Sequence, residues 1–320
     1  MTARRLIDAH AHVWTRGTPG LEWLAGVPEL DRDFALAEYP APAPATRPET
    51  PGNRRVSGRT GRVAGVVLVQ AVNSEEETRE LLAAAREPGA GGGDVRGVVG
   101  WVDLGGADPA GRIEQLRAAP GGEALAGIRH LAHVDPDAEW LVRERTSRGL
   151  DAVARAGLAF DLVVRPWQLA TAARAVDAHP ELQFVLDHLG QPPSGADAGA
   201  GAHAGAGAEG LAHWERGLRA LAERPNVAAK ISGIARRDPD AVERARLDRV
   251  FTVAFETFGP ARLMYGSDWP LVLLADGHDA WTATYLDATA GLSPREQRDI
   301  DGRTALRAYR AETTQQEDIA

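Results

Sequence analysis

Two histidines near the start of the chain have a spacing that suits a functional site. His10 and His12 end an apolar run that begins at Leu6, and alternate residues of a β-strand project to the same face. Two imidazoles side by side can hold a metal ion or polarise a carbonyl group. If they were only packed into a core beside Asp8, they would need several buried hydrogen-bond partners. We therefore interpret His10 and His12 as functional.

Two later apolar runs also end in ionisable residues. Asp187 and His188 follow three apolar residues, and Asp268 stands in the string GSDWP, which stops another run. Neighbours in a strand face opposite ways, so we expect His188 to point into the site while Asp187 orients another group; a helix N-cap by Asp187 is the alternative. A carboxylate beside histidines is well placed to take a proton from water. The predicted catalytic residues are His10, His12, His188 and Asp268.

The elements that must bring these residues together alternate between strand and helix. Short runs rich in Val, Ile and Leu are typical of parallel strands buried on both faces, and they cover residues 6–12, 63–70, 95–104, 125–131, 158–164, 183–190, 226–233 and 262–270. Helical stretches lie between several of them, at residues 74–86, 150–156, 168–178 and 214–223. Ser293 and Glu296 form a capping-box pattern, which predicts a last helix through about Tyr309. Eight strand and helix units predict an α/β fold, a (β/α)8 TIM barrel, whose strand ends meet at one mouth.

A single domain accounts for the length of the chain. A sequence of 320 residues suits one barrel with insertions, and we predict that residues 1–310 form it. Two stretches break the alternation: residues 39–62 are rich in Pro, Arg and Gly, and residues 191–210 include an Ala/Gly tract. We expect irregular insertions at both places and a polar tail over residues 311–320.

Composition narrows the classes of chemistry and of partner. The chain has no cysteine, which leaves histidine and carboxylate as the ligands of any metal. A formal charge of -9 argues against a general affinity for nucleic acid or an anionic membrane. No apolar stretch approaches the length of a membrane span or a signal peptide. We expect a cytoplasmic protein with a small-molecule substrate, as a monomer or a homodimer.

The strings at these strand ends resemble one enzyme superfamily. HxH on the first strand, DH on the sixth and GSDWP on the eighth are similar to the amidohydrolase superfamily. More narrowly, the strings IDAHAHVW, VVGWVDL, GIRH, FVLDHLG, KISG and RLMYGSDWPL resemble its sugar-lactonase-like group, which includes fuconolactonases, rhamnonolactonases and 2-pyrone-4,6-dicarboxylate lactonases. The similar strings run from about residue 6 to residue 309, outside the two irregular stretches.

The resemblance implies hydrolysis of a lactone, either a sugar lactone or a dicarboxylate pyrone. In the mechanism of that group, Asp268 would deprotonate a water that attacks the lactone carbonyl, and the three histidines would stabilise the developing oxyanion. Asp268 would then return the proton to the leaving oxygen. The resemblance also implies that Arg129, on the fourth strand, binds substrate oxygens or a carboxylate through its forked donors.

The same resemblance leaves the metal requirement open. Members of the superfamily with two metals bring a bridging lysine from strand four and a histidine from strand five, whereas this chain has Arg129 and Asp161 at those strands. A dinuclear site is therefore not expected. We expect either no required cofactor or one divalent ion, zinc or manganese, on His10, His12 and Asp268.

Several further residues are candidates for substrate contact, each with a structural alternative. Lys230, the only lysine in the chain, shares a strand face with Ser232 and either contacts substrate or forms a salt bridge inside the barrel. Arg165 follows the fifth strand and Trp269 ends the eighth, where each either lines the pocket or packs loops. His133 follows the fourth strand and is left outside the core site.

Two other functions are kept as alternatives. A metal-dependent decarboxylase or hydratase of the same superfamily would use a similar barrel site with a more tightly held metal, and chelation would abolish its activity. A catalytically inactive barrel that binds a ligand is the third hypothesis. The retention of all four polar groups argues against it.

Overall fold

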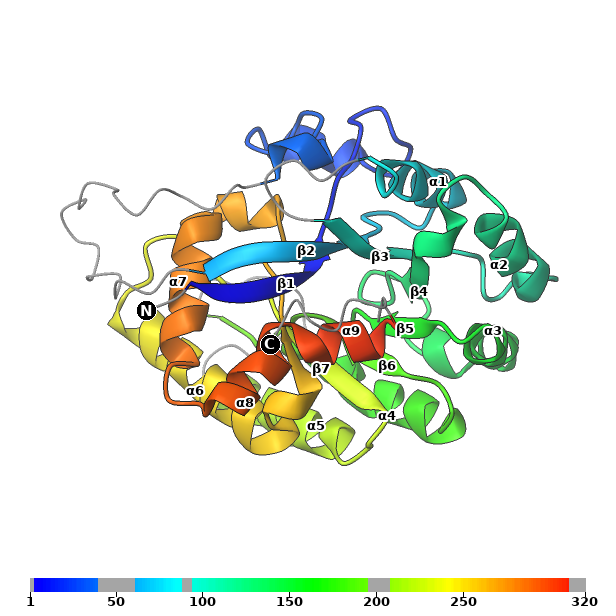
Figure 1. Ribbon diagram of the computed structural model, residues 1–320. Helices are drawn as coiled ribbons and strands as arrows, with labels where there is room; N and C mark the ends of the chain where they lie inside the picture. The colour runs from blue at the N-terminus through cyan, green and yellow to red at the C-terminus, as the bar shows by residue number, and fades with distance from the viewer. Residues whose placement is uncertain (1–2, 40–60, 88–93, 195–207, 311–320) are drawn as a thin grey trace.

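The fold is a barrel of eight parallel strands in sequence order. The computed structural model describes residues 3–39, 61–87, 94–194 and 208–310. Each strand pairs with the next along the chain (Figure 1). The strands are β1 (Arg4–Ala11), β2 (Gly61–Val69), β3 (Asp94–Gly100), β4 (Leu125–His130), β5 (Ala159–Leu162), β6 (Phe184–Leu186), β7 (Val227–Ile231) and β8 (Leu263–Tyr265).

The ends of β1 and β8 close the barrel. Ala11 forms a parallel bridge with Trp269. The backbone N–H of Asp268 donates to the carbonyl of His10 at 2.8 Å, and that of His12 donates to the carbonyl of Trp269 at 2.6 Å. The predicted single (β/α)8 barrel is confirmed, and its seam passes through three of the predicted catalytic residues.

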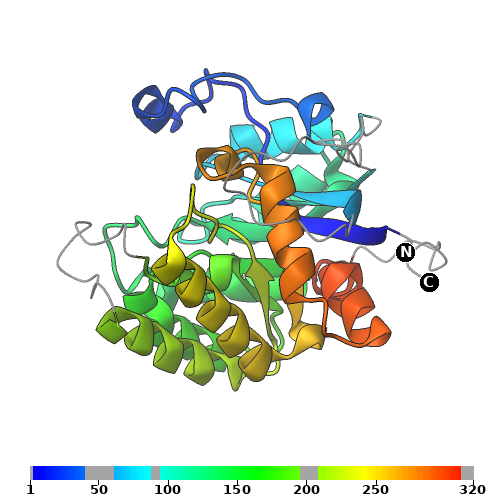
Figure 2. The ribbon, with the colours of Figure 1, turned by 90° about the vertical axis from the view of Figure 1, so that its left-hand side faces the viewer.

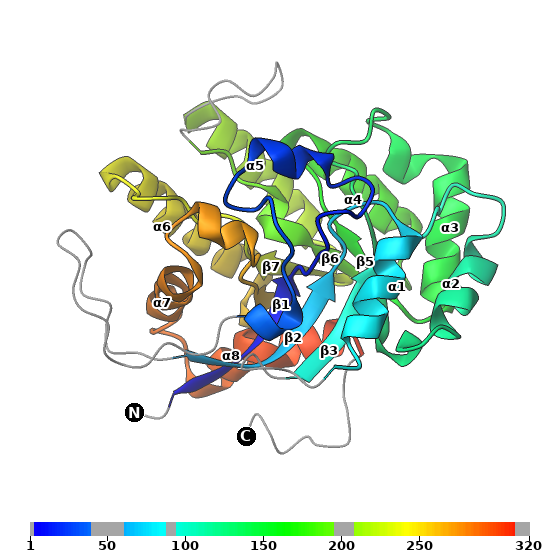
Figure 3. The ribbon, with the colours of Figure 1, turned by 90° about the horizontal axis from the view of Figure 1, so that it is seen from above.

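Helices surround the strands, as the view from above shows (Figure 3). They are α1 (Glu75–Ala84), α2 (Pro109–Arg117), α3 (Glu144–Arg155), α4 (Leu169–Ala178), α5 (Ala208–Ala222), α6 (Ala241–Phe258), α7 (His278–Ala288), α8 (Pro294–Arg298) and α9 (Thr304–Ala308). The capping box of Ser293 and Glu296 is present at the start of α8. The last helix is not continuous, however, because a π-helical segment, Asp299–Arg303, separates α8 from α9. Its Asp301 is buried and accepts hydrogen bonds from Arg4 and from Tyr285.

Apolar side chains pack on both faces of the sheet. The larger core lies between strands and helices. The smaller core fills the barrel interior, where residues near the strand starts, such as Ala126 and Ala228, pack against Ala305, Ala308 and Tyr309. In Figures 1 and 2 the red C-terminal helices accordingly lie away from the blue segment that follows β1. The C-terminal residues thus cover the end of the barrel opposite the mouth.

The connection from β1 to β2 departs from the alternation in its described part. Its described part, residues 12–39, holds two short 3-10 turns, Glu22–Gly26 and Leu36–Glu38, and no α-helix. Strand β2 and helix α5 begin inside the two stretches that were expected to be irregular. The rest of those stretches, residues 40–60 and 195–207, and the expected tail at 311–320 lie outside the described residues.

Across the described ranges, no helix combines the length and the apolar character needed to cross a bilayer.

Candidate active site

A bulge near the end of β1 turns His10 and His12 into the barrel. Between Asp8 and Ala11, β1 advances by one residue more than β2 does. Ala9 belongs to the interior core, so regular alternation would send the next side chain, His10, to the outer face. With the bulge, Nε2 of His10 lies 3.2 Å from Nε2 of His12. The two rings therefore share a face, as their spacing predicts.

The carboxylate of Asp268 faces both rings from the segment after β8. Its Oδ1 lies 3.5 Å from Nε2 of His12 and 3.6 Å from Nε2 of His10. This oxygen is buried and has no hydrogen-bond partner among the described residues. Asp268 also has a φ of 60°, in the left-handed region that side chains rarely adopt. A strained backbone and an unpaired buried oxygen are features of a functional site.

His188 joins these residues from the other side of the barrel. Strand β6 ends at Leu186, and His188 follows with a φ of 55°. Its Nδ1 lies 3.0 Å from the hydroxyl of Ser232, and its ring centroid lies 4.5 Å from that of His10. Gly233 leaves room for the ring, because a Cβ at that position would overlap it. We call four residues the mouth cluster: His10, His12, His188 and Asp268.

Burial and neighbouring groups set the protonation of the mouth cluster. Burial lowers the pKa of His10 well below its usual value, and the charge of Lys230 adds to the effect. Burial also lowers the pKa of His188. At Asp268 burial acts against ionisation, but the neighbouring His188 and His12 outweigh it, so the pKa of this carboxyl is lowered. Near neutral pH, neutral rings of His10 and His188 therefore stand beside an ionised Asp268.

A second group of charges lies beneath the mouth cluster, inside the barrel. The Nζ of Lys230 is 2.6 Å from Asp161 and 2.9 Å from Asp187, and Nη1 of Arg129 donates to Asp187 at 2.8 Å. All four side chains belong to residues that are at most 3% exposed. Two cations face two anions, so the charges balance, as buried ion pairs require. We call these four residues the ionic layer: Arg129, Asp161, Asp187 and Lys230.

His10 connects the two groups. Its Nδ1 lies 3.1 Å from Nζ of Lys230 and 3.3 Å from Oδ1 of Asp187. Asp187 is therefore placed to orient another side chain, as expected of it. The expectation that Asp187 and His188 face opposite ways is wrong, because the strand ends before them and the left-handed backbone of His188 brings both side chains into the interior.

Tyr309 supports the ionic layer from the closed end of the barrel. Its hydroxyl lies 3.0 and 2.9 Å from the two carboxylate oxygens of Asp161. Burial raises the pKa of Asp161 to about 6 against the opposing effect of Lys230. At Asp187 burial acts in the same direction, but Lys230 and His10 outweigh it and hold the pKa well below its usual value. The sequence does not signal the role of Tyr309, because nothing in a C-terminal helix indicates which strand it will touch.

A cavity of about 620 Å³ opens above the mouth cluster. Its volume is in the range of small-molecule sites. The ionisable residues of the lining are His12, Arg129, His133, Arg165, His188, Arg236 and Asp268. The fourth member of the mouth cluster, His10, is fully buried behind them.

The residues predicted to contact substrate divide into two pairs. Arg129 and Arg165 line the cavity, whereas the described lining includes neither Lys230 nor Trp269. Lys230 is fully buried in the ionic layer. Trp269 is buried beside the cavity, where its ring packs edge-on against Phe34.

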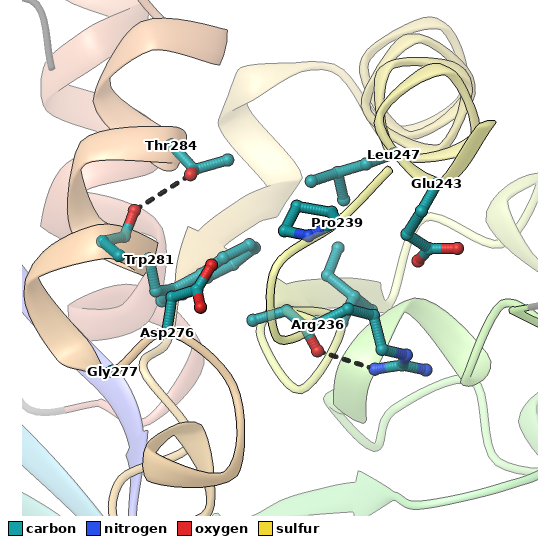
Figure 4. A pocket seen from close by; sticks show the side chains of 11 residues that line it. Arg236, Pro239, Glu243, Leu247, Asp276, Gly277, Trp281 and Thr284 are labelled. Atoms are coloured by element: carbon teal, nitrogen blue, oxygen red, sulfur yellow. Dashed lines mark hydrogen bonds between the residues drawn. The ribbon is translucent and has the colours of Figure 1, made fainter. Parts of the chain in front are cut away.

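Figure 4 shows a second hollow, between the loop after β7 and helix α7. Pro239, Leu247 and Trp281 line it, and its volume is about 50 Å³, enough for only a few water molecules. The guanidinium of Arg236 there donates to the carbonyl of Ala235 at 2.8 Å. This hollow is too small for an organic substrate, so the cavity at the barrel mouth is the candidate active site.

Comparison with known proteins identifies the family. The model of the amidohydrolase family matches residues 7–311, from within β1 to just beyond α9. The chain belongs to the amidohydrolase family. The resemblance seen in the strand-end strings is thereby confirmed.

Related amidohydrolases cover nearly the whole chain. The L-fucono-1,5-lactonase of Burkholderia multivorans is 30% identical over 312 residues, which are 95% of each protein. The L-fucono-1,5-lactonase of Burkholderia ambifaria is 29% identical over 283 residues, 87% of this chain and 85% of the relative. A solved structure of an amidohydrolase from B. multivorans with bound zinc superimposes with a TM-score of 0.75 at 27% identity, covering 95% of this chain and 99% of the other.

The amidohydrolase site offers three donors to a divalent ion. His10, His12 and Asp268 each present one buried ligand atom, and these atoms lie within 4.8 Å of one another. The unpaired Oδ1 of Asp268 supports the fit, because it faces two imidazole nitrogens. Imidazole nitrogen and carboxylate oxygen are the ligands that zinc takes in the absence of cysteine. The residues present therefore fit a divalent cation.

Proposed function

We propose that this amidohydrolase opens a lactone ring by adding water to the ring carbonyl. The observation that carries the proposal is the ionised carboxylate of Asp268, whose Oδ1 has no hydrogen-bond partner among the described residues. It stands beside the neutral imidazoles of His10 and His188 at the floor of a cavity large enough for a sugar lactone. The B. multivorans relative, an L-fucono-1,5-lactonase, supports a sugar lactone as the substrate class.

Asp268 and His12 hold the attacking water in this mechanism. Nδ1 of His12 lies 2.7 Å from the carbonyl oxygen of Val69, which only accepts, so the ring carries its proton on Nδ1 and offers a lone pair at Nε2. A water at the cavity floor donates one hydrogen bond to that lone pair and its other proton to Asp268. The water oxygen then forms a bond to the lactone carbonyl carbon.

His188 stabilises the negative charge that develops on the carbonyl oxygen. The residue lines the cavity, its ring contacts the hydroxyl of Ser232, and its backbone is left-handed. Its ring is therefore already in place when the oxyanion forms. The bond from the carbonyl carbon to the ring oxygen then breaks, and Asp268 returns its proton to that oxygen. The product is a hydroxy acid, and the carboxylate of Asp268 is restored.

A low pKa keeps Asp268 ionised but also makes it a weak base, so polarisation of the carbonyl must supply part of the driving force. His10, His12 and Asp268 would hold a divalent ion, which when bound supplies Lewis-acid polarisation of a carbonyl oxygen. Arg129 and Arg165, at the cavity wall, are the proposed donors to the other substrate oxygens. Because Lys230 and Trp269 lie behind that wall, we propose that they support the site without touching substrate.

The test is the variant Asp268→Asn, assayed for acid release from L-fucono-1,5-lactone, a rhamnonolactone and 2-pyrone-4,6-dicarboxylate. Loss of the proton acceptor should lower kcat by about 10²- to 10⁴-fold on whichever lactone the wild type opens. The matched control is Asp276→Asn, the same change at an acid of the small hollow, which should leave kcat within about twofold.

Two results would contradict the proposal. The first is a wild-type protein that opens none of the lactones above the spontaneous rate. The second is an Asp268→Asn variant that keeps the wild-type kcat.

A further inference from the structure

The single lysine of the chain has three neighbours for its three N–H groups. Nζ of Lys230 lies 2.6 Å from Asp161, 2.9 Å from Asp187 and 3.1 Å from Nδ1 of His10. An ammonium group is a donor only, and a fully buried one must use all of its donors or pay a large desolvation cost. The contact with Asp187 is an ion pair whose Oδ1 has no hydrogen-bond partner among the described residues, so Asp161 and Nδ1 of His10 are the acceptors of Lys230.

This contact decides where the neutral ring of His10 carries its proton. If Nδ1 accepts from Lys230, the proton is on Nε2. The alternative partner of Nδ1 is Oδ1 of Asp187, at 3.3 Å, which would require the proton on Nδ1. Lys230 and Asp187 thus favour opposite tautomers of the same ring.

His12 is arranged to accept the proton that Lys230 places on Nε2 of His10. Its Nδ1–H is fixed on the carbonyl of Val69, so its own Nε2 has a lone pair, 3.2 Å from Nε2 of His10. In the free site, before the attacking water takes the lone pair of His12, the hydrogen bonds run in one direction, from Lys230 through His10 and His12 to Val69. Nη1 of Arg129 donates to Asp187 at 2.8 Å, and its second N–H faces Nε2 of His10 at the longer distance of 3.4 Å. Arg129 therefore acts with Asp187 against the tautomer that Lys230 favours.

A divalent ion needs the other tautomer. To bind the ion together with Asp268, both His10 and His12 must offer lone pairs at Nε2, and a histidine ligand usually donates its remaining N–H to a carboxylate or carbonyl. His12 meets this condition through Val69, but His10 meets it only when its Nδ1–H turns from Lys230 to Asp187.

We propose that Lys230 and Asp187 compete for Nδ1 of His10, and that Lys230 holds the ring in the tautomer that excludes a divalent cation. Lys230 is on this account a positioning residue that keeps the metal affinity of the site low. The inference concerns the free site and holds whichever substrate the enzyme takes.

The direct test is the tautomer of His10 in the wild-type protein. Long-range ¹H–¹⁵N correlation spectra of histidine-labelled protein report which ring nitrogen carries the proton, and comparison with His10→Gln assigns the signal. We expect Nε2 protonated and Nδ1 unprotonated. A proton on Nδ1 would overturn the proposal without any variant having to fold.

The second test removes the competitor while keeping the charges balanced. In the double variant Lys230→Met/Asp161→Asn one cation and one anion are lost together, and the proton of His10 should move to Nδ1, facing Asp187. Zinc binding, measured by calorimetry, should then tighten about 10- to 100-fold over wild type, the usual effect of a partner behind a metal ligand.

The matched control is Asp161→Asn alone, which keeps Lys230 on His10 and should keep both the wild-type tautomer and the wild-type zinc affinity. A double variant that binds zinc no more tightly than wild type would overturn the proposal. So would tighter binding with an unchanged tautomer, because the effect of Lys230 would then be charge repulsion alone.

Discussion

The mouth cluster and the ionic layer are both groups of four buried polar residues, yet they differ in charge balance and in backbone conformation. In the ionic layer two cations face two anions within 3 Å, and Lys230 and Asp161 lie on regular strands. Nε of Arg129 and Oδ1 of Asp187 have no hydrogen-bond partner among the described residues, but each belongs to a side chain with an opposite charge beside it. In the mouth cluster, Oδ1 of Asp268 has no partner among the described residues, and both Asp268 and His188 have left-handed backbones. The ionic layer thus has the features of a stabilising element, and the mouth cluster has those of a reactive site.

His10 is in contact with both groups. It belongs to the mouth cluster by its Nε2 contacts and to the ionic layer by its Nδ1 contacts. A neutral imidazole carries only one N–H proton. A change of partner at Nδ1 of His10 therefore changes whether its Nε2 is a donor or an acceptor in the mouth cluster. We therefore expect substitutions in the ionic layer to lower stability, and substitutions in the mouth cluster to lower activity.

The same substitution in each group gives the sharpest test of this difference. Asp187→Asn leaves Arg129 and Lys230 facing a neutral side chain in the barrel interior, and loss of one partner from a buried charge network costs about 3–5 kcal/mol of unfolding free energy. Asp268→Asn removes a carboxylate that its histidine neighbours stabilise, but it leaves no permanent cation without a partner, because His10 and His188 are neutral. It should therefore cost less unfolding free energy than Asp187→Asn. Denaturant titrations of both variants with equal m-values measure the two effects. Equal losses of stability would show that the two groups do not differ in this way.

Removal of one hydroxyl from the base of the ionic layer should have a smaller effect. Tyr309→Phe deletes the donor to Asp161, and hydrogen bonds to charged groups are worth about 1.5–3 kcal/mol. Tyr265→Phe is the control, because that hydroxyl is also buried but bonds to the neutral Thr282. Loss of this bond should lower the unfolding free energy by about 1 kcal/mol. A larger loss for Tyr265→Phe than for Tyr309→Phe would contradict the ionic character of the layer.

The fold could be predicted because parallel strands buried on both faces need apolar runs, and all eight runs are visible in the sequence. Two of them, 183–190 and 262–270, extend well beyond β6 and β8. The residues that leave the ladder there include His188 and Asp268, which have left-handed backbones, and the ring of His188 occupies space left by Gly233. Side-chain type along the run does not encode that change of direction.

The candidate site could be predicted in part, for a similar reason. Polar residues at the ends of apolar runs stand out, and so does a sole lysine within a strand, for which a buried salt bridge was one of the two interpretations. The partners of Lys230 could not be derived, because they depend on the register between strands and on the docking of Tyr309, which is 148 residues from Asp161. The bulge that turns His10 inward is likewise a property of the β1 and β2 pairing.

The last prediction is a change in pH dependence at the cavity wall above the mouth cluster. Burial, with Arg165 and Arg129 adding to it, lowers the pKa of His133 to about 3, whereas in the unfolded chain a histidine titrates near pH 6.5. Between about pH 3 and pH 6.5 the unfolded state therefore binds more protons at this residue than the folded state does, so its contribution to stability rises with pH across that window and is constant above it. In His133→Gln this rise should disappear, which unfolding midpoints measured at a series of pH values between about 4 and 7 will detect. His213→Gln, at an exposed position on α5, is the control for loss of a histidine. If wild type and His133→Gln gave parallel curves, His133 would not be held neutral by the cavity wall, and the cavity above Asp268 would be more open to water than its lining indicates.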